Sequence, residues 1–150
     1  MALPTSIDLQ IVTPERMLVH EQVDEVEVPG VDGYFGVLPG HTPLLAALSV
    51  GELWYRKGQA QTYLSIVHGF AEILPDRVTI LAQLAERAED IDIERAEAAR
   101  RRAAERLEQK ADVDYERARL SLMKSMTRLQ VSSRIASGAG PRLKRVRQEG

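Results

Sequence analysis

The segment Val78-Thr-Ile-Leu-Ala82, followed after a short interval by Asp90-Ile-Asp-Ile-Glu-Arg-Ala96, contains the change of pattern from which the fold is predicted. Before this change, apolar residues alternate or gather in short β-branched runs. After it, small apolar residues recur at steps of three and four. Alternation is typical of strands, and spacing by three and four is typical of one helix face. We therefore expect two structural units that join near residues 86–90.

The first unit is predicted to be an N-terminal antiparallel β-sandwich over residues 1–87. Short apolar runs recur roughly every 8–12 residues without a helical pattern between them, which is typical of an antiparallel sandwich or barrel. Lys57-Gly58 and Pro75-Asp76 are turn sequences between neighbouring runs. The predicted strands include residues 7–11, 26–28, 52–56, 62–67, 70–74 and 78–82.

The second unit is predicted to be an antiparallel α-helical hairpin over residues 88–137, which makes the chain α+β with two domains. Its two apolar stripes run through Ala96, Ala99, Ala103 and Leu107, and through Tyr115, Ala118, Leu122, Met126 and Leu129. Met123 and Met126 are expected to pack in the core. The connector around Ala111-Asp112 is short, which favours antiparallel helices.

A short echo supports these helix positions. The sequence Asp90-Ile-Asp-Ile-Glu-Arg-Ala96 recurs as Asp112-Val-Asp-Tyr-Glu-Arg-Ala118. We interpret both copies as helix starts, because Asp accepts hydrogen bonds from free backbone N–H groups there. Residues 138–150, with Gly, Pro and scattered basic residues, are predicted to be a disordered basic tail.

Charge separates the two units. Residues 1–85 carry ten acidic and four basic residues, whereas residues 86–150 carry twelve acidic and sixteen basic ones. Units of opposite net charge are expected to have different partners. The sequence has no run long enough for a membrane-spanning helix, and we expect no signal peptide at its start. With no Cys, it has neither disulfides nor thiolate chemistry.

No catalytic residue is predicted. His20, His41 and His68 lie far apart without ligand spacing, so we expect no metal site. The run Gly30-Val-Asp-Gly-Tyr-Phe-Gly36 is not followed by a helical pattern, which favours turns over a phosphate loop. The basic run Arg100-Arg-Arg102 alternates with Glu nearby and lacks aromatic residues for base stacking. It is therefore expected to be a solvated face or to contact an acidic protein rather than nucleic acid.

Two stretches resemble the epsilon subunit of F-type ATP synthases. They are Gly36-Val-Leu-Pro-Gly-His-Thr-Pro-Leu-Leu45 and Gly69-Phe-Ala-Glu-Ile-Leu-Pro-Asp-Arg-Val-Thr-Ile-Leu-Ala82, and the second continues through Glu86-Arg-Ala-Glu-Asp-Ile-Asp92. The resemblance covers roughly residues 5–136. It departs from the family at His68, where the family usually has Gly, and it does not extend to the tail.

The resemblance implies a non-catalytic central-stalk subunit that couples proton-driven rotation of the c-ring to the catalytic head. Its sandwich would contact the gamma subunit and the c-ring, with Tyr34 and His41 at the ring-facing edge. Alternatively, His41 only braces the turn at residues 39–43. The implied location is peripheral, on the cytoplasmic face of the bacterial plasma membrane, and no cofactor is required.

The resemblance also implies a regulatory nucleotide site. The family motif for ATP is matched by Ile91-Asp-Ile-Glu-Arg-Ala96, and the implied ATP-binding residues are Glu86, Asp92, Arg95, Ala96, Arg102 and Arg128. Arg95 and Arg102 are seven residues apart and therefore share a helix face. Lys124 stands where nucleotide-sensing members have Arg, and a Lys lacks the planar fork of an Arg.

In this family the hairpin extends to block ATP hydrolysis, and Lys124, Arg128 and Arg134 are the implied contacts to the catalytic beta subunits. An alanine-rich first helix buries little apolar area, so we expect a weakly held hairpin that opens. The alternative functions are a stand-alone β-sandwich binding module with a coiled-coil adaptor, or a nucleic-acid binder.

Overall fold

The structure is a computed structural model that describes residues 3–109 and 114–136. The predicted tail at 138–150 and the connector around Ala111-Asp112 lie outside these residues. The described residues form one seven-stranded sheet in the order β2-β1-β7-β6-β5-β3-β4. The strands are β1 (Ile7–Val12), β2 (Met17–Val23), β3 (Glu25–Gly30), β4 (Gly33–Val37), β5 (Leu44–Lys57), β6 (Ala60–Leu74) and β7 (Arg77–Arg87).

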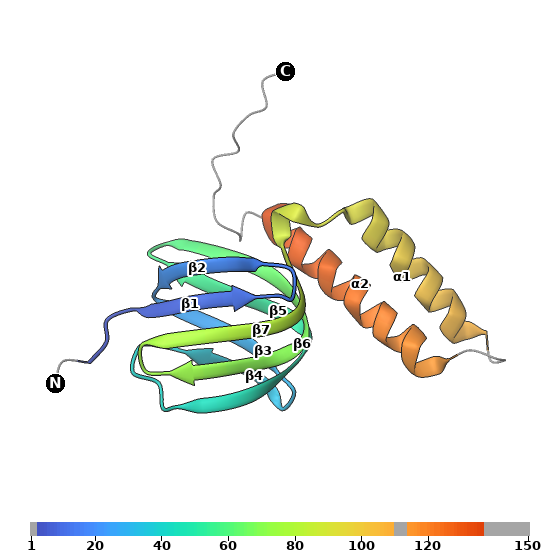
Figure 1. The fold of residues 1–150 in the computed structure, drawn as a ribbon. Helices are drawn as coiled ribbons and strands as arrows, with labels where there is room; N and C mark the ends of the chain where they lie inside the picture. Colours follow the sequence, from blue (N-terminus) through green and yellow to red (C-terminus); the bar gives the residue numbers. More distant parts are fainter. Residues whose placement is uncertain (1–2, 110–113, 137–150) are drawn as a thin grey trace, which may run out of the picture.

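The sheet closes over itself into the predicted sandwich (Figure 1). Alternate residues point into its interior, as in β1, where Ile7, Leu9 and Ile11 are fully buried. One cluster of buried side chains draws on all seven strands, from β1 to Val37 of β4 and Ile80 of β7. The predicted fold class is therefore confirmed for this unit.

The strand pairs are antiparallel with one exception. β1 runs parallel to β7, with Leu9 opposite Val78 and Ile11 opposite Ile80. A parallel pair requires a long connection, and here the connection contains all the other strands. Turn signals between neighbouring strands do not report such a pairing, so the sequence pattern did not predict this one parallel pair within the antiparallel sandwich.

Strand β6 joins two segments that the sequence pattern separates. Residues 62–67 and 70–74 belong to one strand, which passes through His68 (φ 51°) and Gly69 (φ 136°). A Cβ at Gly69 would overlap the carbonyl oxygen of Leu81 on β7. The strand can therefore continue past this irregular point only with glycine at position 69.

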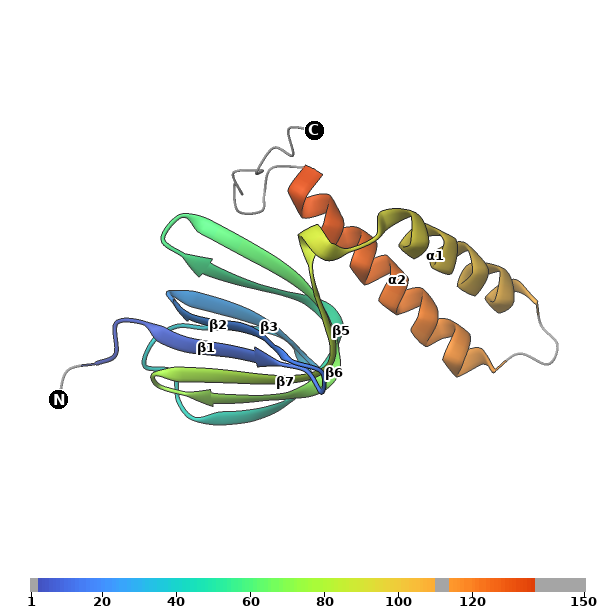
Figure 2. The ribbon, with the colours of Figure 1, turned by 45° about the horizontal axis from the view of Figure 1, so that its top comes forward.

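The second unit is the predicted helical hairpin, which lies beside the sandwich (Figure 2). It consists of a 3₁₀ turn, η1 (Ala88–Asp90), and the helices α1 (Ile93–Glu108) and α2 (Tyr115–Ala136). Asp92 caps α1 by accepting a hydrogen bond from the Arg95 N–H at 3.1 Å. Asp114 accepts one from the Arg117 N–H at 3.2 Å, so both copies of the echo are helix starts.

The inner face of the first helix is as predicted, with Ala96 and Ala103 buried. The predicted stripe of the second helix is wrong in part, because Tyr115 and Met126 are 61% and 54% exposed. Met123 is also exposed, so the two methionines are not core residues. The buried positions of α2 include Ala118, Ser125 and Ser132, which recur every seven residues. Small side chains on both helices allow their backbones to approach closely.

Helix α2 docks on β5, β6 and η1. Val131 is fully buried in a second apolar cluster with Tyr63, Ala88 and Ile91, and the partly buried Trp54 and Ile135 pack against it. This cluster is separate from the sandwich core. Neither of the described helices has the length and apolar character to cross a membrane.

Candidate functional site

A cavity of about 380 Å³ lies between the sheet and the hairpin. Its wall combines residues of β6 and β7 with residues of both helices: Ser65, Val67, Leu84, Glu86, Arg95, Ala99, Ser121, Lys124, Ser125 and Arg128. The helical contributions follow from spacing, since Ser121, Lys124, Ser125 and Arg128 fall at steps of three and four on one face of α2. Three cationic side chains therefore line one cavity together with a single carboxylate.

That carboxylate, Glu86, pairs with Arg128. Nη2 of Arg128 donates to Oε2 of Glu86 at 3.1 Å, and Nε lies 2.7 Å from Oε1 without the alignment of a hydrogen bond. The pair joins β7 to α2 across 42 residues of sequence. An anion that entered the cavity would meet Arg95 and Lys124 directly, and it would compete with Glu86 for Arg128.

The structure brings together only some of the residues implied for a nucleotide site. Glu86, Arg95 and Arg128 line the cavity. Asp92 instead caps α1, and Ala96 is fully buried. Arg102 is exposed and lies outside the cavity wall.

Ser121 and Ser125 are wall residues that the sequence analysis missed. Their four-residue spacing and their position on the same helix face as Lys124 and Arg128 are the signal that would have identified them. The hydroxyl of Ser125 donates within α2, to the carbonyl oxygens of Ser121 and Leu122. Ser125 is therefore already satisfied by its own helix.

A second ion pair joins the end of α2 to the sheet. Arg134 donates from Nε to Glu52 Oε2 at 3.0 Å and from Nη2 to Glu52 Oε1 at 2.9 Å. These hydrogen bonds raise the pKa of the Arg134 guanidinium above its usual value. Burial raises the pKa of the neighbouring Tyr63 hydroxyl, although the charge of Arg134 opposes this effect. Of the residues implied for inhibition, Arg128 and Arg134 thus pair with sheet carboxylates, and Lys124 lines the cavity.

Tyr34 lies in β4, His41 lies in the connection between β4 and β5, and the two residues contact different elements. Tyr34 is 57% exposed, and its hydroxyl oxygen accepts a hydrogen bond from the Glu52 N–H at 3.2 Å. It lines a cavity of about 470 Å³ with exposed apolar residues that include Val31, Leu44 and Leu45. This part of the sandwich therefore exposes several apolar side chains next to one another.

The half-buried His41 lies in a braced turn. Its Nδ1 lies 2.6 Å from the Thr42 carbonyl oxygen, and its backbone N–H donates to the Leu38 carbonyl at 3.2 Å. The N–H of Gly40 donates to the Pro75 carbonyl at 2.7 Å, which ties the turn to the connection between β6 and β7. These contacts are those expected of a bracing residue.

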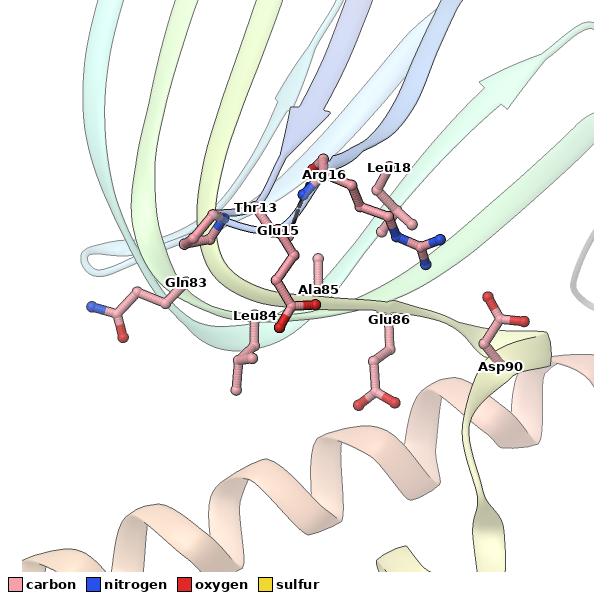
Figure 3. Close-up of a pocket in the computed structure, with 10 residues that line it drawn as sticks. Thr13, Glu15, Arg16, Leu18, Gln83, Leu84, Ala85, Glu86 and Asp90 are labelled. Atoms are coloured by element: carbon pink, nitrogen blue, oxygen red, sulfur yellow. Dashed lines mark hydrogen bonds between the residues drawn. The ribbon is translucent and has the colours of Figure 1, made fainter.

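A further cavity, of about 510 Å³, lies beside the turn between β1 and β2 (Figure 3). Glu15, Arg16, Glu86 and Asp90 contribute its charged side chains. In Figure 3 the Glu86 side chain points toward α2, and this residue lines both cavities. Within residues 3–109 and 114–136, no group of His, Asp and Glu side chains has the arrangement of a metal site.

Comparison with known proteins gives matches to both units. Residues 6–88 match a family described as "ATP synthase, Delta/Epsilon chain, beta-sandwich domain", and residues 89–133 match one described as "ATP synthase, Delta/Epsilon chain, long alpha-helix domain". The ATP synthase epsilon chain of Syntrophobacter fumaroxidans is 50% identical over 129 residues, which cover 85% of this chain and 96% of the relative. That of Solibacter usitatus is 52% identical over 101 residues, 67% of this chain and 75% of the relative.

The fold also resembles a chain in the solved structure of the Euglena gracilis mitochondrial ATP synthase, described as OSCP/F1/c-ring. The TM-score is 0.69 at 22% identity, and the match covers 93% of this chain and 84% of the other. At this identity the similarity concerns the fold.

Proposed function

Because the chain belongs to the family of ATP synthase epsilon chains, which are non-catalytic subunits of that enzyme complex, we propose that it is the central-stalk subunit of a proton-translocating F-type ATP synthase. The observation that carries this proposal is the match of both units, in order, to relatives over almost their whole length. The role is to couple rotation of the c-ring to the catalytic head from the cytoplasmic face of a bacterial plasma membrane.

The sandwich is the part proposed to contact the gamma subunit and the c-ring. The exposed apolar side chains around Tyr34 support a protein contact there, because contiguous apolar surface is unusual on an isolated soluble domain. His41 contributes by holding its turn in place. We expect the isolated chain to co-purify with the head complex of its own organism, and failure to do so would favour a stand-alone binding module.

The hairpin is proposed to inhibit ATP hydrolysis when it extends. Two features support opening: the helices meet through small residues, and α2 is held to the sheet by two ion pairs and a small apolar cluster. Once the hairpin leaves the sheet, Arg128 and Arg134 lose their carboxylate partners and, with Lys124, become available to acidic segments of the catalytic beta subunits.

Truncation after Arg87 tests this inhibitory role. The strand β7 ends at this residue, so the truncated chain retains every strand of the sandwich. We expect a head complex reconstituted with the truncated chain to hydrolyse ATP faster than one with the full chain. Equal rates would remove the inhibitory role and leave the stalk role in place.

The cavity between sheet and hairpin is proposed as a regulatory ATP site of the docked hairpin. Arg95, Lys124 and Arg128 supply positive charge for a triphosphate. Because Arg95 lies on α1 and the other two lie on α2, only a closed hairpin with its helices side by side holds them together. A ligand that binds one conformation shifts the population toward it by its differential affinity. ATP would therefore oppose extension.

Titration calorimetry with ATP tests the site, and Lys124→Arg sharpens the test. An Arg at this position offers a planar fork to a phosphate, so we expect affinity to rise several-fold, on the order of 1 kcal/mol. Lys57→Arg is the matched control, because Lys57 lies in the exposed turn at the end of β5, outside the cavity wall. No heat from either the natural chain or Lys124→Arg at millimolar ATP would contradict the proposed site.

A further inference from the structure

The last turns of α2 are joined to the sheet by a cluster of three side chains, Glu52, Tyr63 and Arg134. Arg134 makes two hydrogen bonds to the carboxylate of Glu52, at 3.0 and 2.9 Å. Its guanidinium carbon lies 5.3 Å from the centre of the Tyr63 ring, within the range of a cation–π contact. Glu52 and Arg134 are 82 residues apart, so the cluster exists only while the hairpin is docked.

The burial of Glu52 makes this contact more consequential than a surface ion pair. Its side chain is 9% exposed, against 36% for Arg134. A covered carboxylate without a partner is strongly unfavourable, because it has lost water without gaining a counter-charge. Docking of α2 over Glu52 is therefore less favourable when Arg134 does not arrive with it.

The apolar cluster that surrounds this contact is small. It consists chiefly of Val131 and Ile135 of α2 against Trp54 and Tyr63 of the sheet, with Ala88 and Ile91 at the junction. The other ion pair, Glu86–Arg128, lies in the wall of the candidate nucleotide cavity. Glu52 and Arg134 are not part of that wall, so their contact lies outside the candidate nucleotide cavity.

We propose that Glu52, Tyr63 and Arg134 form a latch that holds the hairpin in its docked position. The proposal deepens the inhibitory role and rests on it only for its physiological meaning, since a hairpin that extends must first leave this contact. The latch itself is a property of the isolated chain.

The chain carries its own reporter of docking. Trp54 is the sole tryptophan of the sequence and packs against the docking cluster that includes Val131 of α2. Release of α2 exposes it to water and shifts its emission to longer wavelength. Hydrogen exchange at the backbone amides of residues 131–135 supplies a second, site-resolved measure of the same opening.

The decisive experiment is a double-mutant cycle in the full chain, with Glu52→Gln, Arg134→Gln and the two combined. We expect each single change to lower the protection of residues 131–135 roughly ten-fold and to shift Trp54 emission. The double variant should lose no more than the larger single effect, because both changes remove one interaction. Arg134→Lys keeps the charge but loses the planar fork, so the protection of residues 131–135 in this variant should lie between that of the natural chain and that of Arg134→Gln.

Arg119→Gln is the matched control, because it removes one positive charge from α2 at a residue that pairs with Glu116 of the same helix. Unchanged protection in Arg134→Gln, strictly additive effects in the cycle, or an equal loss in Arg119→Gln would overturn the latch. Amides of Leu53 and Leu64 in the sandwich core report whether Glu52→Gln disturbs the sheet. If it does, the comparison of Arg134→Gln, Arg134→Lys and Arg119→Gln decides alone.

The latch and the inhibitory role can fail separately. A ten-fold loss of protection in Arg134→Gln, together with unchanged ATP hydrolysis after truncation at Arg87, would keep the latch and remove the proposed inhibition. Unchanged protection in Arg134→Gln, together with faster ATP hydrolysis after truncation at Arg87, would keep the proposed inhibition and remove the latch. Other contacts would then hold the hairpin in its docked position.

Discussion

At the scale of single residues, His68 and Gly69 have backbone conformations that are unusual inside a strand. His68 has φ 51°, and it is the sole non-glycine residue with positive φ among residues 3–109 and 114–136. A side chain in this left-handed region costs roughly 1–2 kcal/mol relative to the usual backbone regions, whereas glycine enters it freely. The resemblance noted from the sequence departs from the family at this same position, where glycine is usual.

His68→Gly is therefore expected to stabilise the chain by about 0.5–1 kcal/mol, since the relief of strain exceeds the added entropy of the unfolded state. Gly69→Ala is expected to have the opposite effect and to cost more, because its Cβ would meet the Leu81 carbonyl oxygen. Gly36→Ala is the control, since a Cβ there meets open space and its φ is not positive. Urea unfolding measures all three, and a destabilised His68→Gly would contradict the argument.

At the scale of elements, the sequence pattern predicted the hairpin better than the packing of its second helix. Ala96 and Ala103 were found on the inner face because they recur with helical spacing among charged residues. The face of α2 was misjudged because Met126 and Tyr115 are apolar, although α1 offers only small side chains to pack against. Close approach selected Ala118, Ser125 and Ser132 instead. The hydrophobicity of the side chains alone therefore does not predict which face of α2 is buried.

The cap of α1 offers a test of how the hairpin is started. Asp92 accepts from the Arg95 N–H and adds negative charge at the helix N-terminus. Asp92→Ala is expected to cost about 1 kcal/mol and to raise hydrogen exchange in the first turn of α1. Asp92→Asn keeps the acceptor and should retain most of the protection. If ATP affinity falls in Asp92→Ala but not in Asp92→Asn, the residue acts through the position of Arg95 rather than by touching the ligand.

At the scale of the whole molecule, contacts between residues far apart in the sequence are the features that the sequence pattern could not predict. The cavity wall joins β6, β7, α1 and α2. Of the residues implied for a nucleotide site, which stays a prediction, this wall contains Glu86, Arg95 and Arg128 but not Asp92, Ala96 or Arg102. The pairings Glu86–Arg128 and Glu52–Arg134 span 42 and 82 residues. No local pattern encodes them, because each depends on how the hairpin docks on the sheet.

Unfolding of the sandwich and undocking of the hairpin can be distinguished by how each responds to alkaline pH. Burial is the main cause that raises the pKa of Tyr55, in the sandwich core, and of Tyr63, beneath α2, above the usual 10.0. The folded chain then holds these protons more tightly than the unfolded chain does. Stability should therefore be fully present below pH 10 and fall as the pH rises above it.

The two tyrosines should report different transitions. Tyr63→Phe keeps the ring under Arg134 but removes the ionisable hydroxyl, so undocking, followed by the wavelength of Trp54 emission, should lose its onset above pH 10. Tyr55→Phe should reduce instead the pH dependence of sheet unfolding, followed by far-ultraviolet circular dichroism. An unchanged alkaline shift of Trp54 emission in Tyr63→Phe would contradict this prediction. Ionisation of Tyr63 would then not be the cause of undocking, and the pH dependence of undocking would have to come from groups in the sheet.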